Sequence, residues 1–267
     1  MPSYEFLDHP GPIPFAHRGG ARGYPENSMP AFQHAVDLGY RYLETDVHAT
    51  CDGVLVAFHD RTLDRVTDRS GPIARLPYSA VARARIDGAE PIPLLEDVLG
   101  SWPQARVNID IKDEPAIAPL LRALHRTRSW HRVGITSFST RRLIQFRARL
   151  PIYTDQRVCM TLGPRGIAAL RARTAGRPLE MCTRFNQAGV GCVQLPSGLG
   201  RLPLVTEAFV QGAHAHGLPV HVWTVNDPAE MERLLDLGVD GLFTDDLEAL
   251  RRVLTTRGLW PTPHPTT

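Results

Sequence analysis

The sequence predicts an α/β protein, a single (β/α)8 TIM barrel with a small insertion after the second strand. Short β-rich runs alternate with helical patterns about eight times along the 267 residues, which is typical of parallel strands joined by right-handed crossovers. The first strand is followed by His17-Arg18-Gly19-Gly20, which is not the glycine-rich fingerprint of an open dinucleotide-binding sheet. Barrels of about 200–250 residues are routinely one domain, so we assign 1–267 to a single domain.

Elements in the first third follow from apolar runs and from start and stop signals. A helix is predicted over 30–38 because Ser28 can cap its start and Gly39 ends it. Residues 61–91 mix turns with one short helical stretch over 79–85, so we expect a small insertion there and not a βα unit. The strands predicted in this third cover 14–16, 40–47 and 54–58.

The alternation is more regular in the rest of the chain. Strands are predicted at 106–111, 133–136, 152–158, 190–195, 219–225 and 241–243. Helices are predicted at 94–99, 116–125, 141–149, 166–173, 205–216, 229–237 and 247–255. The last residues, 257–267, end in a Pro- and Thr-rich run and are expected to form a loose tail.

Composition excludes several functional classes. Thirty Lys and Arg against 28 Asp and Glu give a net charge of only +2, which argues against a nucleic-acid binder. No apolar run approaches the roughly 20 residues of a membrane span, and the acidic start does not resemble a signal peptide. Four cysteines without C-x-x-C spacing make a disulfide framework or zinc site unexpected, so we expect a cytoplasmic protein.

One composition detail concerns a single position. Of the 30 basic residues only Lys112 is a lysine. Arg and Lys differ most where a compact, rotatable ammonium is needed in a tight site. The lone lysine is therefore a candidate for a specific role.

Polar residues collect at the ends of the predicted strands, where a barrel carries its chemistry. Glu44 and Asp46 are two residues apart, so their side chains face the same side of one strand. Asp110 and Lys112 have the same spacing on another strand. Three inward carboxylates are hard-oxygen ligands that suit Mg²⁺ or Ca²⁺. The alternative is that these acids form structural ion pairs with nearby arginines.

Two histidines and two cations complete the pattern. His17 and His59 each close a strand and could act as general base and general acid, or be ordinary polar histidines. Arg18 and Lys112 supply positive charge for an anion such as phosphate. Trp223 could be core packing or a wall against substrate. Together these residues indicate metal-assisted phosphoryl chemistry without naming the ester.

The other histidines are expected to lie outside the site. His48 should face away from Asp46, and His221 should take a core or rim position. Ordinary polar roles are expected for His9, His34, His125, His131, His214, His216 and His264.

Several short motifs resemble one family, the glycerophosphodiester phosphodiesterases. The resemblance spans roughly residues 13–250, and its blocks occur in the family's order. The blocks are His17-Arg18-Gly19 with Pro25-Glu26-Asn27-Ser28, Leu43-Glu44-Thr45-Asp46-Val47, Asp52-Gly53 with Phe58-His59-Asp60, Asn108-Ile109-Asp110-Ile111-Lys112, Ser137-Phe138, Trp223-Thr224-Val225-Asn226, and Gly238-Val239-Asp240-Gly241 through Thr244-Asp245.

The resemblance implies a (β/α)8 barrel that hydrolyses glycerophosphodiesters to sn-glycerol 3-phosphate and an alcohol with a divalent cation. Asp110 departs from the family's usual Glu, being one methylene shorter, so the resemblance does not specify which divalent cation is bound. By position, the implied roles are acid–base for His17 and His59, metal binding for Glu44, Asp46 and Asp110, and phosphate or substrate binding for Arg18, Lys112, Phe138 and Trp223.

Two other functions stay open at this point. One is a lysophospholipase D that uses the same site on lysophospholipids, which would need an apolar groove beside Phe138 and Trp223. The other is a non-catalytic barrel that binds phosphorylated ligands, against which the complete set of acids and bases argues. In each case the expected partner is a small phosphate-containing molecule, and neither nucleic acid nor an integral membrane segment is expected.

Overall fold

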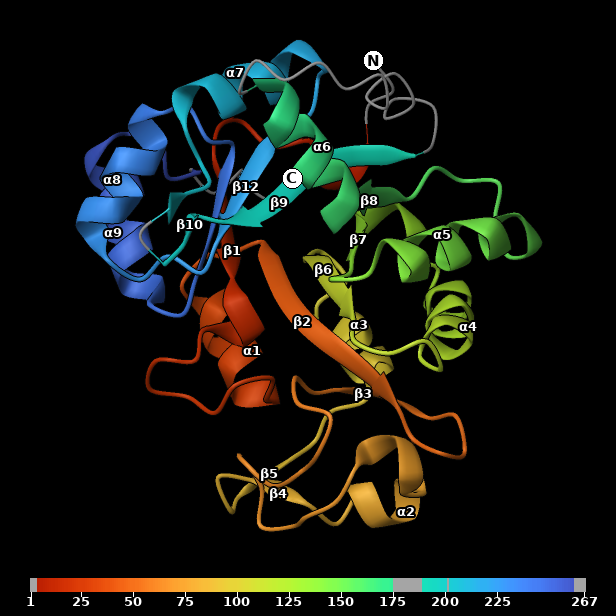
Figure 1. Ribbon diagram of the computed structural model, residues 1–267. Helices are drawn as coiled ribbons and strands as arrows, with labels where there is room; N and C mark the ends of the chain where they lie inside the picture. The colour runs from red at the N-terminus through yellow and green to blue at the C-terminus, as the bar shows by residue number, and fades with distance from the viewer. Residues whose placement is uncertain (1–3, 175–188, 201, 262–267) are drawn as a thin grey trace, which may run out of the picture.

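A closed ring of parallel strands forms the centre of the computed structural model, which describes residues 4–174, 189–200 and 202–261 (Figure 1). The ring consists of β1 (Ile13–Ala16), β2 (Tyr42–Ala49), β6 (Arg106–Ile111), β7 (Val133–Thr136), β8 (Cys159–Thr161), β9 (Val190–Pro196), β12 (Val220–Trp223) and β13 (Gly241–Thr244). Each strand pairs with the next in this order, and β13 pairs with β1, which closes the barrel. The predicted (β/α)8 barrel is confirmed.

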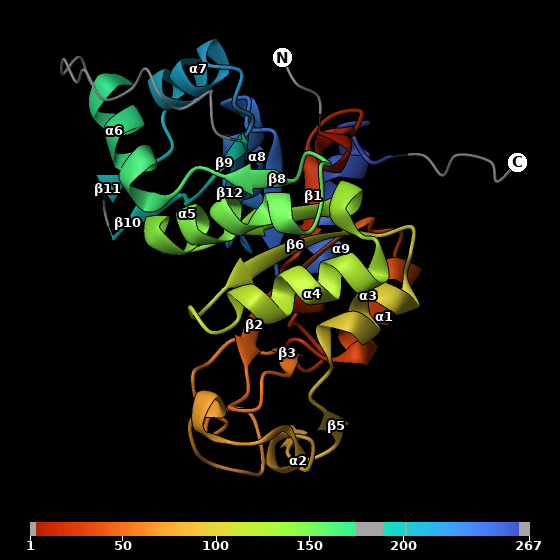
Figure 2. The same ribbon diagram turned by 90° about the vertical axis from the view of Figure 1, so that its right-hand side faces the viewer.

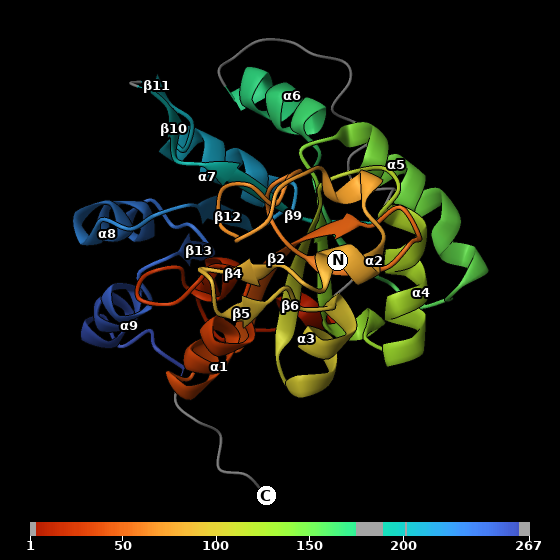
Figure 3. The same ribbon diagram turned by 90° about the horizontal axis from the view of Figure 1, so that it is seen from below.

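Helices surround the barrel, as the view along it shows (Figure 3). They are α1 (Met29–Asp37), α3 (Leu95–Ser101), α4 (Ile117–Thr127), α5 (Thr140–Arg149), α6 (Pro164–Thr174), α7 (Glu207–Ala215), α8 (Pro228–Asp236) and α9 (Leu247–Thr256). Ser28 caps α1 as predicted, because its hydroxyl accepts from the Ala31 N–H at 3.3 Å. Within the described ranges, none of the helices has the length and apolar character that crossing a membrane requires.

The segment after β2 leaves the ring of strands. β3 (Leu55–Ala57) pairs antiparallel with β2, so the strand predicted at 54–58 is a hairpin partner and not a barrel strand. The next residues form α2 (Tyr78–Val81) and the short strands β4 (Arg85–Ile86) and β5 (Glu90–Pro91). The helix predicted over 79–85 is therefore only a single turn. This insertion has its own small apolar core and lies beyond the carboxyl end of β2 (Figure 2).

The strand predicted at 152–158 is wrong. Ile152 lies in a short 3-10 helix, Leu150–Ile152, and its side chain is 77% exposed. The barrel strand is β8, which begins at Cys159 and is fully buried. The apolar Ile152 and Val158 suggested a strand, but polar exposed residues separate them and only the second leads into the barrel wall.

The loose tail predicted from residue 257 is wrong for its first part. Leu259 and Trp260 pack against the main core, and the Trp260 ring meets Tyr40 edge-on at 5.1 Å between centroids. Arg251 lies over the same indole at 5.8 Å. The remaining residues, 262–267, lie outside the described part of the chain. The assignment of the whole chain to one domain stays a prediction.

Candidate active site

The side chains predicted to carry the chemistry meet in one cavity of about 150 Å³. It opens where β1, β2, β6, β7 and β12 end. A larger cavity, of about 820 Å³, contains none of these side chains and lies near Arg41 and Arg106, at the opposite ends of the strands. The predicted residues that line the smaller cavity are His17, Arg18, Glu44, Asp46, His59, Asp110, Lys112, Phe138 and Trp223.

Two neighbouring strands supply the three carboxylates. Glu44 and Asp46 both point inward from β2 because side chains two residues apart share a face. The register pairs Asp46 with Asp110 of β6, so these two acids lie side by side. The Lys112 ammonium lies between them, 2.7 Å from Asp46 Oδ1 and 2.8 Å from Asp110 Oδ2. The buried carboxylates of Asp46 and Asp110 therefore share one partly buried cation.

Burial and charge shift these groups in different directions. Burial and the neighbouring Asp46 carboxylate raise the pKa of Glu44 to about 7. Burial also raises the pKa of Asp110, although Lys112 opposes the shift. For Asp46 the positive charges of Lys112 and Arg18 outweigh burial and lower the pKa. The neighbouring positive charges therefore compensate the negative charge of Asp46 best and that of Glu44 worst.

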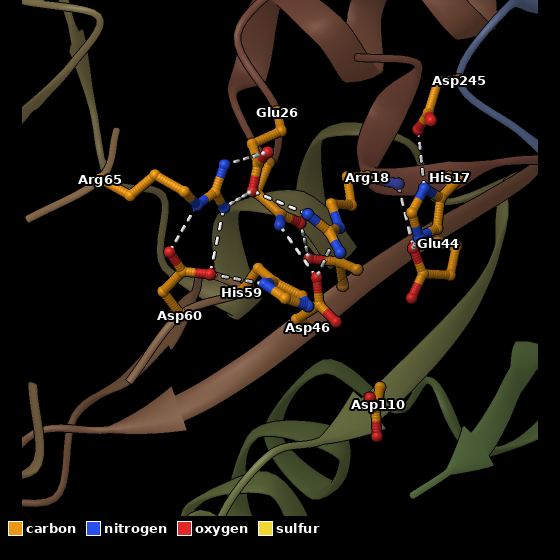
Figure 4. Close-up of polar contacts among 12 residues, drawn as sticks. His17, Arg18, Glu26, Glu44, Asp46, His59, Asp60, Arg65, Asp110 and Asp245 are labelled. Carbon is orange, nitrogen blue, oxygen red and sulfur yellow. Dashed lines mark hydrogen bonds and ion pairs between the residues drawn. The ribbon is translucent and has the colours of Figure 1, made fainter. Parts of the chain in front are cut away.

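His17 lies in the tight turn that follows β1, with Arg18 at a positive φ of 51°. Its Nδ1 donates to Asp245 Oδ1 at 2.7 Å, and its Nε2 lies 3.9 Å from Glu44 Oε2 (Figure 4). Burial alone would lower the pKa of His17, but the carboxylates of Glu44 and Asp245 outweigh it and raise the pKa. Because Nδ1 is engaged, Nε2 is the nitrogen available for proton transfer.

His59 lies on the other side of the cavity, just after β3. Its Nδ1 donates to Asp60 Oδ1 at 2.6 Å, and Asp60 in turn accepts from Arg65 Nε at 2.5 Å (Figure 4). Burial lowers the pKa of His59, with Asp46 opposing the shift. Hydrogen bonding to Arg65 lowers the pKa of Asp60 to about 2, so it stays ionised and fixes the imidazole.

The segment between β1 and α1 orients the Arg18 guanidinium and the Asp46 carboxylate. Glu26 accepts from Arg18 Nη1 at 3.0 Å and from Arg65 Nη2 at 2.6 Å, which links the two histidine regions. Asn27 has a positive φ of 55° and donates from Nδ2 to Asp46 Oδ2 at 3.1 Å. This explains the Pro25–Ser28 motif: its side chains hold Arg18 and Asp46 in place.

Two aromatic residues form a wall of the cavity. Phe138 and Trp223 meet edge-on at 5.2 Å between ring centroids, and Lys112 Nζ lies 5.4 Å from the Phe138 centroid. The Phe138 side chain is 61% exposed, which is high for a large apolar residue beside a charged site. The arrangement favours the wall interpretation of Trp223 over simple core packing.

Other histidines take structural positions. His48 lines no part of the active-site cavity; it is buried, with Nδ1 donating to Asp113 at 2.7 Å and Nε2 lying 3.1 Å from the His59 carbonyl oxygen. His221 is fully buried in the barrel and contacts the Phe15 ring at 5.1 Å. Both positions agree with the sequence-based expectations. His264 lies outside the described residues.

The donor set of the active-site cavity, three carboxylates, suits a hard divalent cation. Among the described residues, no three His, Cys, Asp or Glu side chains converge as a metal centre. However, Asp110 Oδ1 is buried without a hydrogen-bond partner in the described structure, and burial together with the neighbouring Asp46 carboxylate raises the pKa of Glu44. Unpartnered buried carboxylate oxygens are the feature that a bound cation would satisfy. The residues present therefore fit such an ion.

Sequence analysis placed four further residues in the family's motifs but assigned them no role. Asp245, Asp60, Glu26 and Asn27 hold the two histidines, Arg18 and Asp46. Asp245 stands at the end of the last barrel strand, and Asp60 directly follows His59, so their places at strand ends were the available signal. Pairing with a particular histidine depends on strand neighbours that the sequence alone does not give.

Comparisons with known proteins agree with this arrangement. The model of the glycerophosphoryl diester phosphodiesterase family matches residues 17–249. "Probable glycerophosphodiester phosphodiesterase 2" of Mycobacterium tuberculosis is 45% identical over 97% of this chain and 97% of its own length. A glycerophosphodiester phosphodiesterase of Bacillus altitudinis is 31% identical over 86% and 93%. An Oleispira antarctica phosphodiesterase, solved with the product sn-glycerol-3-phosphate, superposes with a TM-score of 0.74 at 22% identity, over 92% of this chain and 97% of that one.

Proposed function

The chain belongs to the glycerophosphoryl diester phosphodiesterase family, and on that premise we propose that it hydrolyses glycerophosphodiesters to sn-glycerol 3-phosphate and an alcohol in the cavity between His17 and His59. The observation that carries the proposal is the convergence of two carboxylate-oriented histidines, three acids and two cations on one cavity. A non-catalytic phosphate-binding barrel would have no need for imidazoles held by Asp245 and Asp60.

The two histidines provide the acid and the base. One imidazole takes a proton from the nucleophile, which is either water or the substrate's own glycerol hydroxyl. Attack by the hydroxyl gives a cyclic phosphate, which a water molecule then opens to sn-glycerol 3-phosphate. The other imidazole gives a proton to the oxygen of the leaving alcohol as the P–O bond breaks. Asp245 and Asp60 fix each ring through Nδ1, so that proton transfer takes place at Nε2. Either histidine is compatible with either role.

Arg18 and Lys112 bind the phosphoryl oxygens. Arg18 is held by Glu26 and lies 3.4 Å from Asp46, and Lys112 is held between Asp46 and Asp110. Both cations are thus fixed before substrate arrives, which favours electrostatic stabilisation of the transition state. Phe138 and Trp223 form an aromatic side of the same cavity.

A divalent cation, Mg²⁺ or Ca²⁺, would be held by Glu44, Asp46 and Asp110. When bound, such an ion acts as a Lewis acid on the phosphoryl group. The orphaned Asp110 oxygen and the raised pKa of Glu44 support this part of the proposal. A cytoplasmic location completes it, supported by the free thiols of Cys51, Cys159 and Cys192 among the described residues.

Lysophospholipids are a second candidate substrate class. The exposed Phe138 ring at the cavity, together with Leu199 and Leu202 on the hairpin after β9, which are 65% and 57% exposed, could contact an acyl chain. The test is a panel of glycerophosphodiesters and lysophospholipids incubated with the purified chain and either Mg²⁺ or Ca²⁺. We expect sn-glycerol 3-phosphate in a coupled dehydrogenase assay. Cleavage of a lysophospholipid at the same bond gives lysophosphatidic acid and the free alcohol, so release of the alcohol is measured as well. Alcohol release from lysophospholipids alone would favour the second candidate, and no product from any compound would reject the proposal.

A further inference from the structure

A second cavity, of about 460 Å³, lies directly beside the active site. Lys112 lines both cavities, so they lie on two sides of one side chain. The insertion forms one wall through Arg61 and Arg75, and the start of α5 forms the other through Arg141 and Arg142. Figure 3 shows the insertion covering this end of the barrel, with α2 on the side of α5.

The charge in this cavity is predominantly positive. Its two acids are already engaged: Asp113 pairs with His48 at 2.7 Å, and Glu114 accepts from Gln145 at 2.8 Å. Arg141 is a weak additional partner of Glu114 at 3.5 Å. These contacts do not involve the other arginine side chains that line the cavity.

Among the residues that the structure describes, the remaining arginines form no ion pair, although the Asp110 and Asp113 carboxylates act on Arg142 from a longer distance. In the described part of the chain neither Arg61 nor Arg75 forms an ion pair, and both are exposed. Arg142 donates to the carbonyl of Ile111 and is held against the end of β6. Like charges gathered in one cavity repel each other, so an unpaired arginine group of this kind is a site that an anion would stabilise.

The active-site cavity, of about 150 Å³, is the smaller of the two. Its lining carries the two histidines and the three acids, so the reacting phosphodiester and the glycerol attached to it occupy this space. The alcohol on the other side of the phosphorus extends out of it, and the arginine-lined cavity is the neighbouring space on the far side of Lys112.

We infer that the cavity lined by Arg61, Arg75 and Arg142 binds an anionic group on the leaving alcohol, a carboxylate or a phosphate. This rests on the proposed function and names its substrate class: glycerophosphodiesters whose alcohol carries a negative charge. Arginine forks bind both kinds of oxyanion in a bidentate manner. A cationic alcohol such as choline would meet repulsion in the same place.

Two matched substrate pairs isolate the anionic group. Glycerophosphoserine differs from glycerophosphoethanolamine by one carboxylate, and bis(glycerophospho)glycerol differs from glycerophosphoglycerol by one phosphodiester arm. Steady-state kcat/KM is measured for each compound with the wild type, the double variant Arg61→Gln/Arg75→Gln, and the control Arg69→Gln. Arg69 is an exposed arginine of the same insertion that does not line the cavity, with a side chain 57% exposed.

The expected result is a preference of the wild type for the anionic member of at least one pair. In the double variant, kcat/KM for that member falls by about tenfold, mainly through KM, because two charge-assisted contacts are lost. For the member whose alcohol is neutral or cationic, kcat/KM of the double variant differs less than twofold from the wild-type value. For the Arg69→Gln control, kcat/KM changes less than twofold with every compound. A response to the serine pair alone identifies a carboxylate, and a response to the glycerol pair alone identifies a phosphate.

Two outcomes overturn the inference in different ways. If the wild type turns over all four compounds equally, or if the double variant affects both members of each pair alike, the arginine cavity has no role in substrate choice while the proposed function stands. If the wild type turns over none of the four and no other glycerophosphodiester, both the proposed function and this inference fail.

Discussion

Replacing Lys112 with Met should destabilise the protein markedly at neutral pH. The substitution removes the ammonium that lies 2.7 and 2.8 Å from two carboxylates whose side chains are 3% and 4% exposed. Removing one partner of a buried ion pair costs about 3–5 kcal/mol. The loss should be about 3 kcal/mol, the lower end of that range, because Arg18 remains 3.4 Å from Asp46. For a chain of this size that corresponds to a fall in Tm of roughly 6–12 °C.

The pH dependence of this loss has a definite sign. Burial already raises the folded-state pKa of Asp110, and without the opposing charge of Lys112 it rises further. The pKa of Asp46, which Lys112 and Arg18 hold down against burial, rises as well when Lys112 is removed. A carboxyl whose folded pKa is raised loses stability as pH rises through that pKa, and has no effect below its unfolded pKa, about 4. The difference between variant and wild type should therefore be largest near pH 7 and shrink towards about pH 4.5.

Urea unfolding followed by circular dichroism measures this difference. Samples contain EDTA, so that no divalent cation replaces the lost charge. Arg69→Met is the control: it removes an exposed basic side chain and should change the free energy of unfolding by less than about 0.5 kcal/mol. Equal stability of Lys112→Met and wild type at pH 7, or a deficit that grows on acidification, would refute the reasoning.

Three further predictions follow from the site. Substituting His17 or His59 by Ala should reduce kcat by at least about a hundredfold with the circular dichroism spectrum unchanged; near-wild-type turnover of either variant contradicts the acid–base role. Exhaustive chelation should abolish turnover, and adding Mg²⁺ or Ca²⁺ should restore it; full activity after chelation argues against a metal. Asp245→Asn should move the NMR titration of His17 in EDTA to lower pH, because the Asp245 carboxylate raises the His17 pKa; an unchanged or higher midpoint would count against that pairing.

The sequence was most informative where one strand carries the pattern. The period-two spacing of Glu44 and Asp46 places both on one face whatever the neighbouring strands are. The strand-end rule also placed His17 correctly, because β1 is a barrel strand. His59 reaches the cavity by another route, because it follows β3, which runs antiparallel to β2. The spacing on β2 and the place of His17 depend on local geometry, which the sequence determines directly.

Features that depend on distant partners were out of reach. His17 and Asp245 are 228 residues apart, and their contact requires β13 to close against β1. The pairing of Asp46 with Asp110 depends on the register between β2 and β6, which many offsets of an apolar strand would satisfy. The strand predicted at 152–158 was misplaced for a related reason. Ile152 and Cys159 are both apolar, but only Cys159 is buried, and burial depends on the tertiary structure.

A comparison of Arg65 with Lys112 explains in physical terms why position 112 holds a lysine. Arg65 spreads its planar fork over Asp60 and Glu26 at the surface, where its side chain is 48% exposed and has room. Lys112 instead fits a compact ammonium between carboxylates on adjacent strands, with its side chain only 16% exposed. Three N–H bonds on one small nitrogen can point to both acids and still face the cavity. A guanidinium would need to lie flat against one carboxylate, and its added width would push Phe138 or the neighbouring acid aside. In a chain that otherwise uses arginine, space between two buried acids is what requires lysine here.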